Sequence, residues 1–243
     1  MSIRQVAVPT EHGGWSLTLE PVILGLLVEP SVAGVLLGLS ALLAFMARTP
    51  LRIVLVDRYR ERKLDRTALA ARVLFAEAVV IVLLVVGATV LGSPRFWVIT
   101  VFAAPVAVLG LAFDLRSRSR HLTAELAGTL AISSVAAAIA LAGGGAWKVS
   151  VGLWVIAGAR AVSAIPYVRV QLRRRKGHTF QRWGSDLAQF VAVDMVVLGL
   201  AFEAVSVPAV IAVVILAVLH VVLSRAPVPA VPVIGARQIV FGL

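Results

Sequence analysis

The sequence contains no cysteine, and its 243 residues include only 12 Asp and Glu. The absence of cysteine excludes disulfide scaffolds, thiolate catalysis and metal centres that need cysteine ligands. The motifs of P-loop nucleotide binding, serine hydrolases, zinc peptidases and dinucleotide binding are also missing. Apolar residues make up 60% of the chain, against roughly 45–50% in soluble domains. This composition excludes a disordered chain and argues against an ordinary soluble globule.

Eight long apolar segments predict an all-α, polytopic transmembrane helical bundle, because a spanning helix needs about 20 apolar residues. The segments are Gly13–Val28, Val32–Ala47, Thr67–Leu91, Phe96–Phe113, Thr123–Ala142, Val149–Val168, Asp186–Ala204 and Val207–Leu223. Runs such as VVIVLLVV do not alternate in polarity, as the strands of a membrane barrel would. The sequence therefore predicts one transmembrane domain over residues 1–223. A Pro-rich cytoplasmic tail, residues 224–243, is expected to be extended, with no ninth span.

The 23 Lys and Arg residues and the net charge of +11 could indicate a nucleic-acid partner. Their distribution indicates topology instead. Arg95 and Lys148 fall on one side of the predicted spans, Arg160 falls within a span, and all the others fall on the N-terminal side. By the positive-inside rule, both termini are cytoplasmic and the basic loops contact anionic membrane lipids. No nucleic-acid partner is expected.

Several ionisable residues lie within the predicted spans, where charge is costly and usually functional. They include Glu20, Glu77, Glu125, Arg160 and Asp194. Arg160 and Asp194 each lie eight residues from the cytoplasmic end of a span, about 12 Å deep, and we predict that they form a pair. Because these groups lie in the cytoplasmic half, we expect a polar cavity that opens to the cytoplasm.

Two basic segments also carry possible chemistry. Asp57, Glu61 and Asp65 are spaced i, i+4, i+8, so one helix would align their carboxylates on a single face able to hold Mg²⁺. The alternative is a solvated helix laced with salt bridges. The stretch from Tyr167 to His178 carries arginines that suit phosphate or carboxylate recognition, or that only orient the chain.

Near the N-terminus, Glu11 and His12 stand at the mouth of the expected cavity, where His12 could act in acid–base chemistry. No catalytic residue is assigned. The candidate ligand-binding residues are Glu11, His12, Glu20, Arg48, Asp57, Glu61, Asp65, Glu125, Arg160, Tyr167, Arg169 and Asp194.

Four stretches resemble the YwiC-like family of bacterial integral membrane proteins. They are PTEHGGWSLTLEPVILG, Arg48-Thr49-Pro50-Leu51, Glu125-Leu126-Ala127-Gly128 and Tyr167-Val168-Arg169. The resemblance implies a multi-pass protein of the bacterial cytoplasmic membrane, and it carries no established activity.

The layout is more distantly similar to that of UbiA-type prenyltransferases, whose aspartate-rich cytoplasmic loops bind Mg²⁺ and a prenyl diphosphate. Where that family has NDxxDxxxD, this chain reads DRYRERKLD, with Asp57, Glu61 and Asp65 as its carboxylates. The second motif is replaced by YVRVQLRRRKG, which has none. Two Mg²⁺ ions on a diphosphate need about four or more carboxylates, so this loss predicts anion binding without standard two-site magnesium chemistry.

Three functions are therefore expected in turn. The first is the binding of an anionic lipid or isoprenoid-like ligand. The second is divergent prenyl or lipid transfer, with Mg²⁺ as a possible cofactor, and the third is the transport of a small solute.

Overall fold

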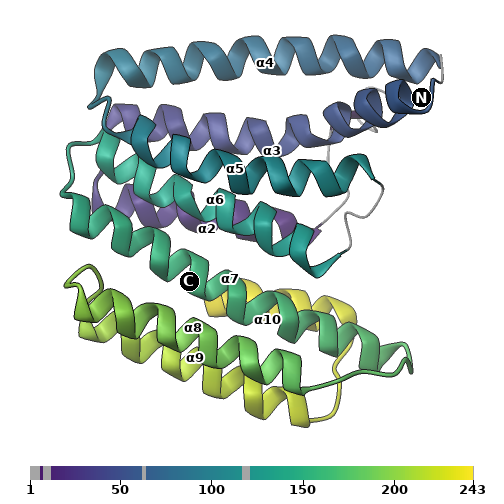
Figure 1. The fold of residues 1–243 in the computed structure, drawn as a ribbon, viewed down its shortest axis with the longest axis vertical. Coiled ribbons are helices and arrows are strands. Elements are labelled where there is room, and N and C mark those ends of the chain that lie inside the picture. The colour runs from purple at the N-terminus through teal and green to yellow at the C-terminus, as the bar shows by residue number, and fades with distance from the viewer. Residues whose placement is uncertain (1–5, 8–11, 62–63, 117–120, 243) are drawn as a thin grey trace.

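The computed structural model describes residues 6–7, 12–61, 64–116 and 121–242, and the regular elements in them are helices (Figure 1). The helices are α2 (His12–Val28), α3 (Val32–Tyr59), α4 (Asp65–Leu91), α5 (Phe96–Leu115), α6 (Leu122–Ala142), α7 (Trp147–Arg175), α8 (Trp183–Ala201), α9 (Val207–Arg225) and α10 (Val231–Gly242). Each of the eight predicted segments corresponds to one of α2 to α9. The predicted all-α polytopic bundle is confirmed.

Seven helices, α3 to α9, are long and apolar enough to cross a membrane. The helix α2 has 17 residues, or about 25 Å at 1.5 Å per residue, slightly less than the ~30 Å hydrocarbon core. The helices run alternately between two edges of the molecule (Figure 1), as successive spans must. The chain is a multi-pass membrane protein.

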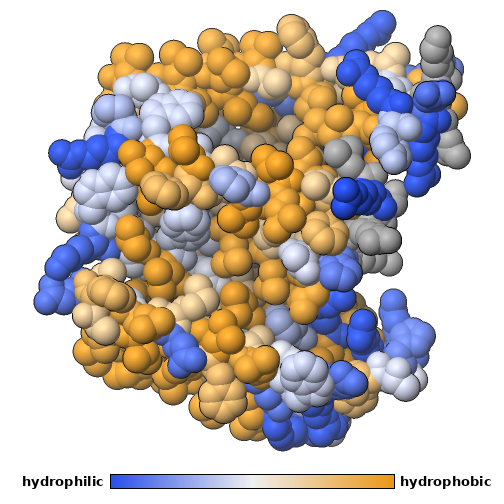
Figure 2. Space-filling model, viewed as in Figure 1, coloured by the Kyte–Doolittle hydropathy of each residue, from blue (hydrophilic) through white to orange (hydrophobic). Residues whose placement is uncertain are grey.

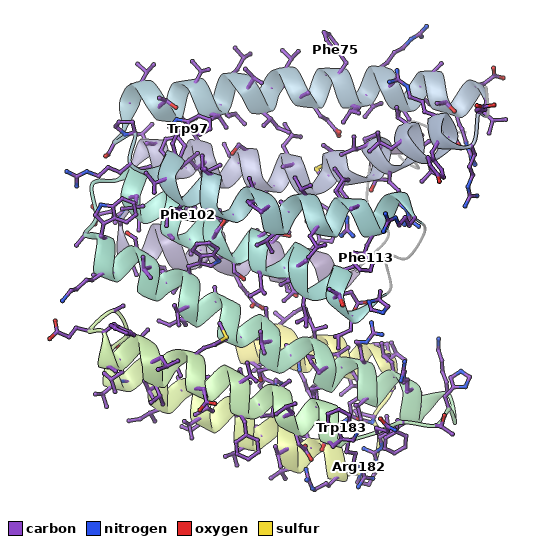
Figure 3. All side chains as sticks on the ribbon, in the orientation of Figure 1. Phe75, Trp97, Phe102, Phe113, Arg182 and Trp183 are labelled. Atoms are coloured by element: carbon purple, nitrogen blue, oxygen red, sulfur yellow. The ribbon has the colours of Figure 1, made fainter. Side chains whose placement is uncertain are left out.

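Charged side chains gather at one edge, on the right in Figure 2, whereas the sides of the helices are mainly apolar. At that edge α3, α5, α7 and α9 end, and α7 finishes with Arg173, Arg174 and Arg175. We call it the basic edge. The apolar sides include Phe75, which is 72% exposed and points away from α4 (Figure 3). Such a surface contacts membrane lipids.

Short polar caps close the turns between the spans. Between α2 and α3, the Ser31 hydroxyl accepts a hydrogen bond from the Gly34 N–H at 2.9 Å, which caps the start of α3. After α6, Gly144 has a φ of 98°, a left-handed conformation that favours glycine. These turns make antiparallel neighbours of successive helices.

Far from the basic edge, the core is apolar and tightly packed. Ala33, Leu37, Phe96 and Ile139 belong to one buried cluster there. A Cβ added at Gly25 would lie 2.9 Å from the Ala136 carbonyl oxygen, so α2 and α6 approach closely only with glycine at this position. The outer half of the bundle is therefore closed by small and branched apolar side chains.

The conformation predicted for the tail is wrong over Val231–Gly242, which forms α10. The prolines at 227, 229 and 232 fall in the linker and in the first turn of α10, where a proline costs a helix little. The helix α10 packs against α2 and α7, with Ile234 and Gln238 buried. Its 12 residues reach about 18 Å, less than a full span. The division between residues 1–223 and 224–243 stays a prediction.

Candidate functional site

A network of polar side chains joins five helices in the interior of the bundle. Its members are Glu20 on α2, Arg160 and Ser163 on α7, Gln189 on α8, His220 on α9 and Gln238 on α10. Ser163 and His220 are fully buried, and Arg160 and Gln238 are each only 9% exposed. Polar groups so placed in a membrane protein need partners within the protein.

The guanidinium of Arg160 is the centre of this network. Its Nη1 donates to Gln238 Oε1 at 3.2 Å. Its Nη2 donates to the backbone carbonyl of Gln238 at 2.6 Å and to Glu20 Oε1 at 3.4 Å. The short bond to the carbonyl is the tightest of the three. Arg160 therefore ties α10 and α2 to α7.

The predicted pair between Arg160 and Asp194 is wrong. The anionic partner of Arg160 is Glu20, on α2. Asp194 is exposed on α8, whose buried face carries Ala188, Ala192 and Val196. Equal depth does not bring two residues together when one of them points out of the bundle.

The hydrogen bonds beyond Arg160 run in a single direction. Arginine only donates, so Gln238 Oε1 accepts from it, and the Gln238 amide nitrogen must face His220 Nε2, 3.1 Å away. Because this nitrogen donates, His220 Nε2 accepts, and the ring proton sits on Nδ1, 2.7 Å from Ser163 Oγ. Ser163 in turn donates to Gln189 Oε1 at 2.5 Å. The chain is thus internally consistent with a neutral His220.

Aromatic rings enclose His220. Tyr167 stacks on the imidazole with ring centroids 4.3 Å apart, and Phe241 of α10 meets it edge-on at 5.8 Å. The Tyr167 hydroxyl has no hydrogen-bond partner among the described residues, and neither has Arg160 Nε. Two donors on α7 are thus buried without acceptors, at a cost of about 1–3 kcal/mol each.

The sequence pattern of α10 explains how it enters this site. Ile234 and Gln238 are four residues apart and share its buried face. Gly242 lies so close to the Glu20 carboxylate that a Cβ there would collide with it. The C-terminal end of α10, where the helix dipole is negative, therefore lies against Arg160.

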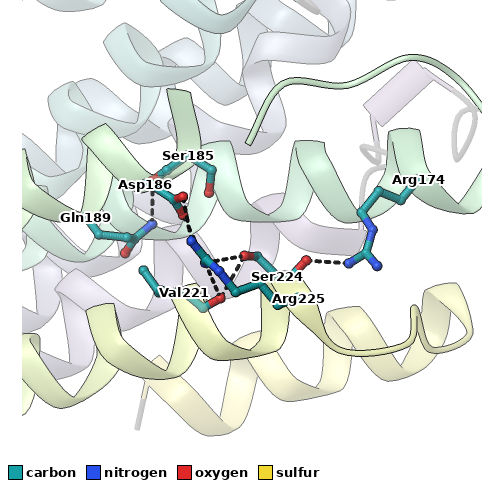
Figure 4. A network of polar contacts seen from close by, with 7 residues as sticks. All are labelled: Arg174, Ser185, Asp186, Gln189, Val221, Ser224 and Arg225. Atoms are coloured by element: carbon teal, nitrogen blue, oxygen red, sulfur yellow. Dashed lines mark hydrogen bonds and ion pairs between the residues drawn. The ribbon is translucent and has the colours of Figure 1, made fainter. Parts of the chain in front are cut away.

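A second polar cluster lies at the basic edge (Figure 4). Arg225 pairs with Asp186 at 3.0 Å, linking the end of α9 to the start of α8. Arg174 donates to the carbonyls of Ser224 at 2.5 Å and Ala226 at 3.0 Å. Since the last carbonyls of a helix lack partners within it, Arg174 acts as a C-terminal cap for α9. This arginine of the basic run has a structural role.

The predicted alignment of Asp57, Glu61 and Asp65 on one helix is wrong. The helix α3 ends at Tyr59, Glu61 has a φ of 54°, and Asp65 begins α4. Asp57 is 1% exposed, and its carboxylate accepts two hydrogen bonds from Arg66, at 2.8 and 3.2 Å, and one from Thr67. Over the described residues, no group of three or more His, Asp and Glu side chains could hold a metal ion.

The remaining candidates are dispersed. Arg169 pairs with Glu125 at 2.8 Å, joining α7 to α6 near the basic edge. Arg48 lies in α3, on the turn before Pro50. Glu11 lies outside the described residues, and only the backbone of His12 is described, as the first residue of α2.

Ser163, Gln189 and Gln238 were not among the candidates predicted from sequence. Ser163 and Gln189 are isolated polar residues within apolar helices, which is the available signal for a buried site. For Gln238 no such signal exists, because its segment is too short to predict a span.

The comparisons with known proteins now bear on this arrangement. A family model described as "YwiC-like protein" matches residues 8–140, more than half of the chain. The chain belongs to the YwiC-like family. No curated protein and no solved structure matches it, so the resemblance to UbiA-type prenyltransferases stays a prediction.

The YwiC-like match begins before α2 and ends within α6. It includes Gly14 and Trp15, which both meet Phe45 of α3. The Trp15 and Phe45 rings lie edge to face at 5.2 Å, and a Cβ at Gly14 would collide with Phe45. Of the network around Arg160, only Glu20 lies inside the match.

Proposed function

We propose that this YwiC-like protein binds an amphiphile with an anionic head group at Arg160, in the bacterial cytoplasmic membrane. The observation that carries this proposal is the state of the Arg160 guanidinium. It is buried, one N–H has no acceptor, and its shortest bond goes to a helix carbonyl of α10. A phosphate or carboxylate oxygen is the acceptor that such a guanidinium prefers.

In this proposal α10 occupies the place of the ligand. It presents a carbonyl, an amide and the negative end of a helix dipole to Arg160, as an anionic head group would. Its other side carries exposed Ile239 and Val240, which face the lipid. An amphiphile could therefore reach Arg160 from the bilayer where α10 moves aside, with its acyl or isoprenoid chain left in lipid.

The other two predicted functions have less support. Transfer of a prenyl group with Mg²⁺ needs free carboxylates, whereas Asp57 is held by Arg66 and Thr67. Transport would need polar groups through the whole thickness, whereas the half of the bundle far from the basic edge is filled by apolar residues such as Leu37, Phe96 and Ile139.

The test is the thermal stability of purified protein with added phosphatidylglycerol, phosphatidylcholine or inorganic phosphate. We expect phosphatidylglycerol to raise the Tm of the wild-type protein and of Arg173→Gln, which loses an exposed charge, but not of Arg160→Gln. An equal rise with phosphatidylcholine would overturn the proposal. An equal rise with inorganic phosphate would show that the head group alone is bound.

Arg160→Gln also leaves Glu20 unpaired, at a cost of about 3–5 kcal/mol, so a second variant is needed in case it does not fold. Gln238→Ala removes the amide that α10 places on Arg160 and His220. If α10 and the ligand compete, this variant has a lower Tm without lipid and a larger rise with phosphatidylglycerol. A smaller rise than in the wild-type protein would contradict the competition.

A further inference from the structure

The helix α8 presents an exposed carboxyl group at the middle of an apolar face. Asp194 is the twelfth of its 19 residues, about 16 Å from the start of the helix and about 10 Å from its end. Along the same face lie Leu187, Phe190, Val191 and Leu198, all exposed. Their spacing of three, four and seven residues places them above and below Asp194.

Asp194 has no partner in the part of the chain that the structure describes. The lone cations and carboxylates near the ends of α8 are paired, Asp186 with Arg225 and Glu203 with Lys148. Exposed middle sections of other outer helices are apolar, for example Val79, Val82 and Val86 on α4. A carboxyl group that faces hydrocarbon is costly and is expected to be covered.

We propose that this face of α8 is the contact between two copies of this chain. Every copy has the same orientation in the membrane, because its charges gather at one edge. A twofold axis along the membrane normal then brings two α8 helices together in parallel, with both Asp194 residues at one depth. Two carboxyl groups that share one or two protons supply each other's donors and acceptors.

A second copy is favoured over a different partner because the group is self-complementary in this geometry. The apolar residues around Asp194 are equally self-complementary, since each side of the contact presents the same ridge of Val191 and Leu198. Hydrogen bonds between polar side chains are a recognised source of affinity between transmembrane helices, at about 0.6–2 kcal/mol.

The absence of cysteine makes a direct test possible. Val191→Cys and Leu198→Cys, in separate proteins in liposomes, would be trapped as disulfide-linked dimers by mild oxidation. The matched control is Val82→Cys, on an exposed face of α4. We expect trapping of the two α8 variants to be about tenfold faster than that of the control. Equal rates for all three variants would overturn the proposal.

Changes at Asp194 separate its role from that of the apolar ridge. In the Val191→Cys background, Asp194→Asn keeps a self-complementary hydrogen-bonding group, whereas Asp194→Val removes it. We expect Asn to preserve the trapping rate and Val to lower it about tenfold. Because Asp194 is exposed, both variants are expected to keep the wild-type Tm. Unchanged trapping with Asp194→Val would refute the role of the carboxyl group.

Discussion

Arg160 shows how one buried charge can organise a membrane bundle. It draws Glu20 and Gln238 together from helices on different sides of α7. A buried ion pair gains little net stability, because desolvation offsets the attraction. Its contribution is therefore one of geometry, in that it selects the position of α2 and α10 against α7.

Asp57 is a second residue whose role is set by its partners. Since Arg66 and Thr67 bind its carboxylate, it links the end of α3 to the start of α4. We expect Arg66→Ala to lower the free energy of unfolding by about 2 kcal/mol, because hydrogen bonds to a buried charge are lost.

Arg72→Ala is the matched control for that prediction. It removes the same charge from an exposed position of α4 and should change stability by less than about 0.5 kcal/mol. Both values can be measured by reversible denaturant unfolding in mixed micelles. Equal effects of the two substitutions would show that the bond to Asp57 does not stabilise the protein.

The sequence predicted the depth of the charged residues better than their direction. On α8, the buried residues Ser185, Ala188, Ala192 and Val196 define one face. Asp194 is two positions from Ala192, about 200° around the helix, so a projection of small residues would have placed it outside. Depth is read from chain position, whereas direction depends on packing that a single helix does not reveal.

At the scale of elements, close packing explains why α2 is short and rich in glycine. We expect Gly25→Ala to destabilise the protein by about 1–3 kcal/mol, because its Cβ would press on the α6 backbone. Gly128→Ala is the control, since a Cβ there meets nothing within 4 Å. It should stabilise α6 by up to about 1 kcal/mol.

Thermal unfolding of both variants checks this prediction. A stabilising effect of Gly25→Ala would mean that α2 and α6 can separate without loss, and that their close approach is not required.

The elements differ in how well the sequence predicts them. Apolar runs located α2 to α9 to within a few residues at most ends, because the bilayer sets both their length and their composition. The exceptions are α3 and α7, which continue beyond the predicted ends, to Tyr59 and Arg175. The helix α10 was missed because prolines and a short apolar run are equally compatible with an extended tail.

At the scale of the whole molecule, the charge asymmetry predicts a fixed orientation. Ser206, before α9, lies at the edge opposite the basic edge, and His178, after α7, lies at the basic edge. In intact cells, we expect Ser206→Cys to react with a membrane-impermeant maleimide, and His178→Cys to react only after permeabilisation. The reverse pattern would place the basic edge outside.

The separation of Glu20 from Arg160 has a consequence for how the protein is made. The two residues are 140 positions apart, so α2 enters the membrane long before α7 is synthesised. Until then Glu20 is a polar group without its cation in a young, incomplete bundle, where an insertion machinery must tolerate it. The pairing that positions α2 is thus among the late events of assembly, and the first helix to enter is not the first to settle.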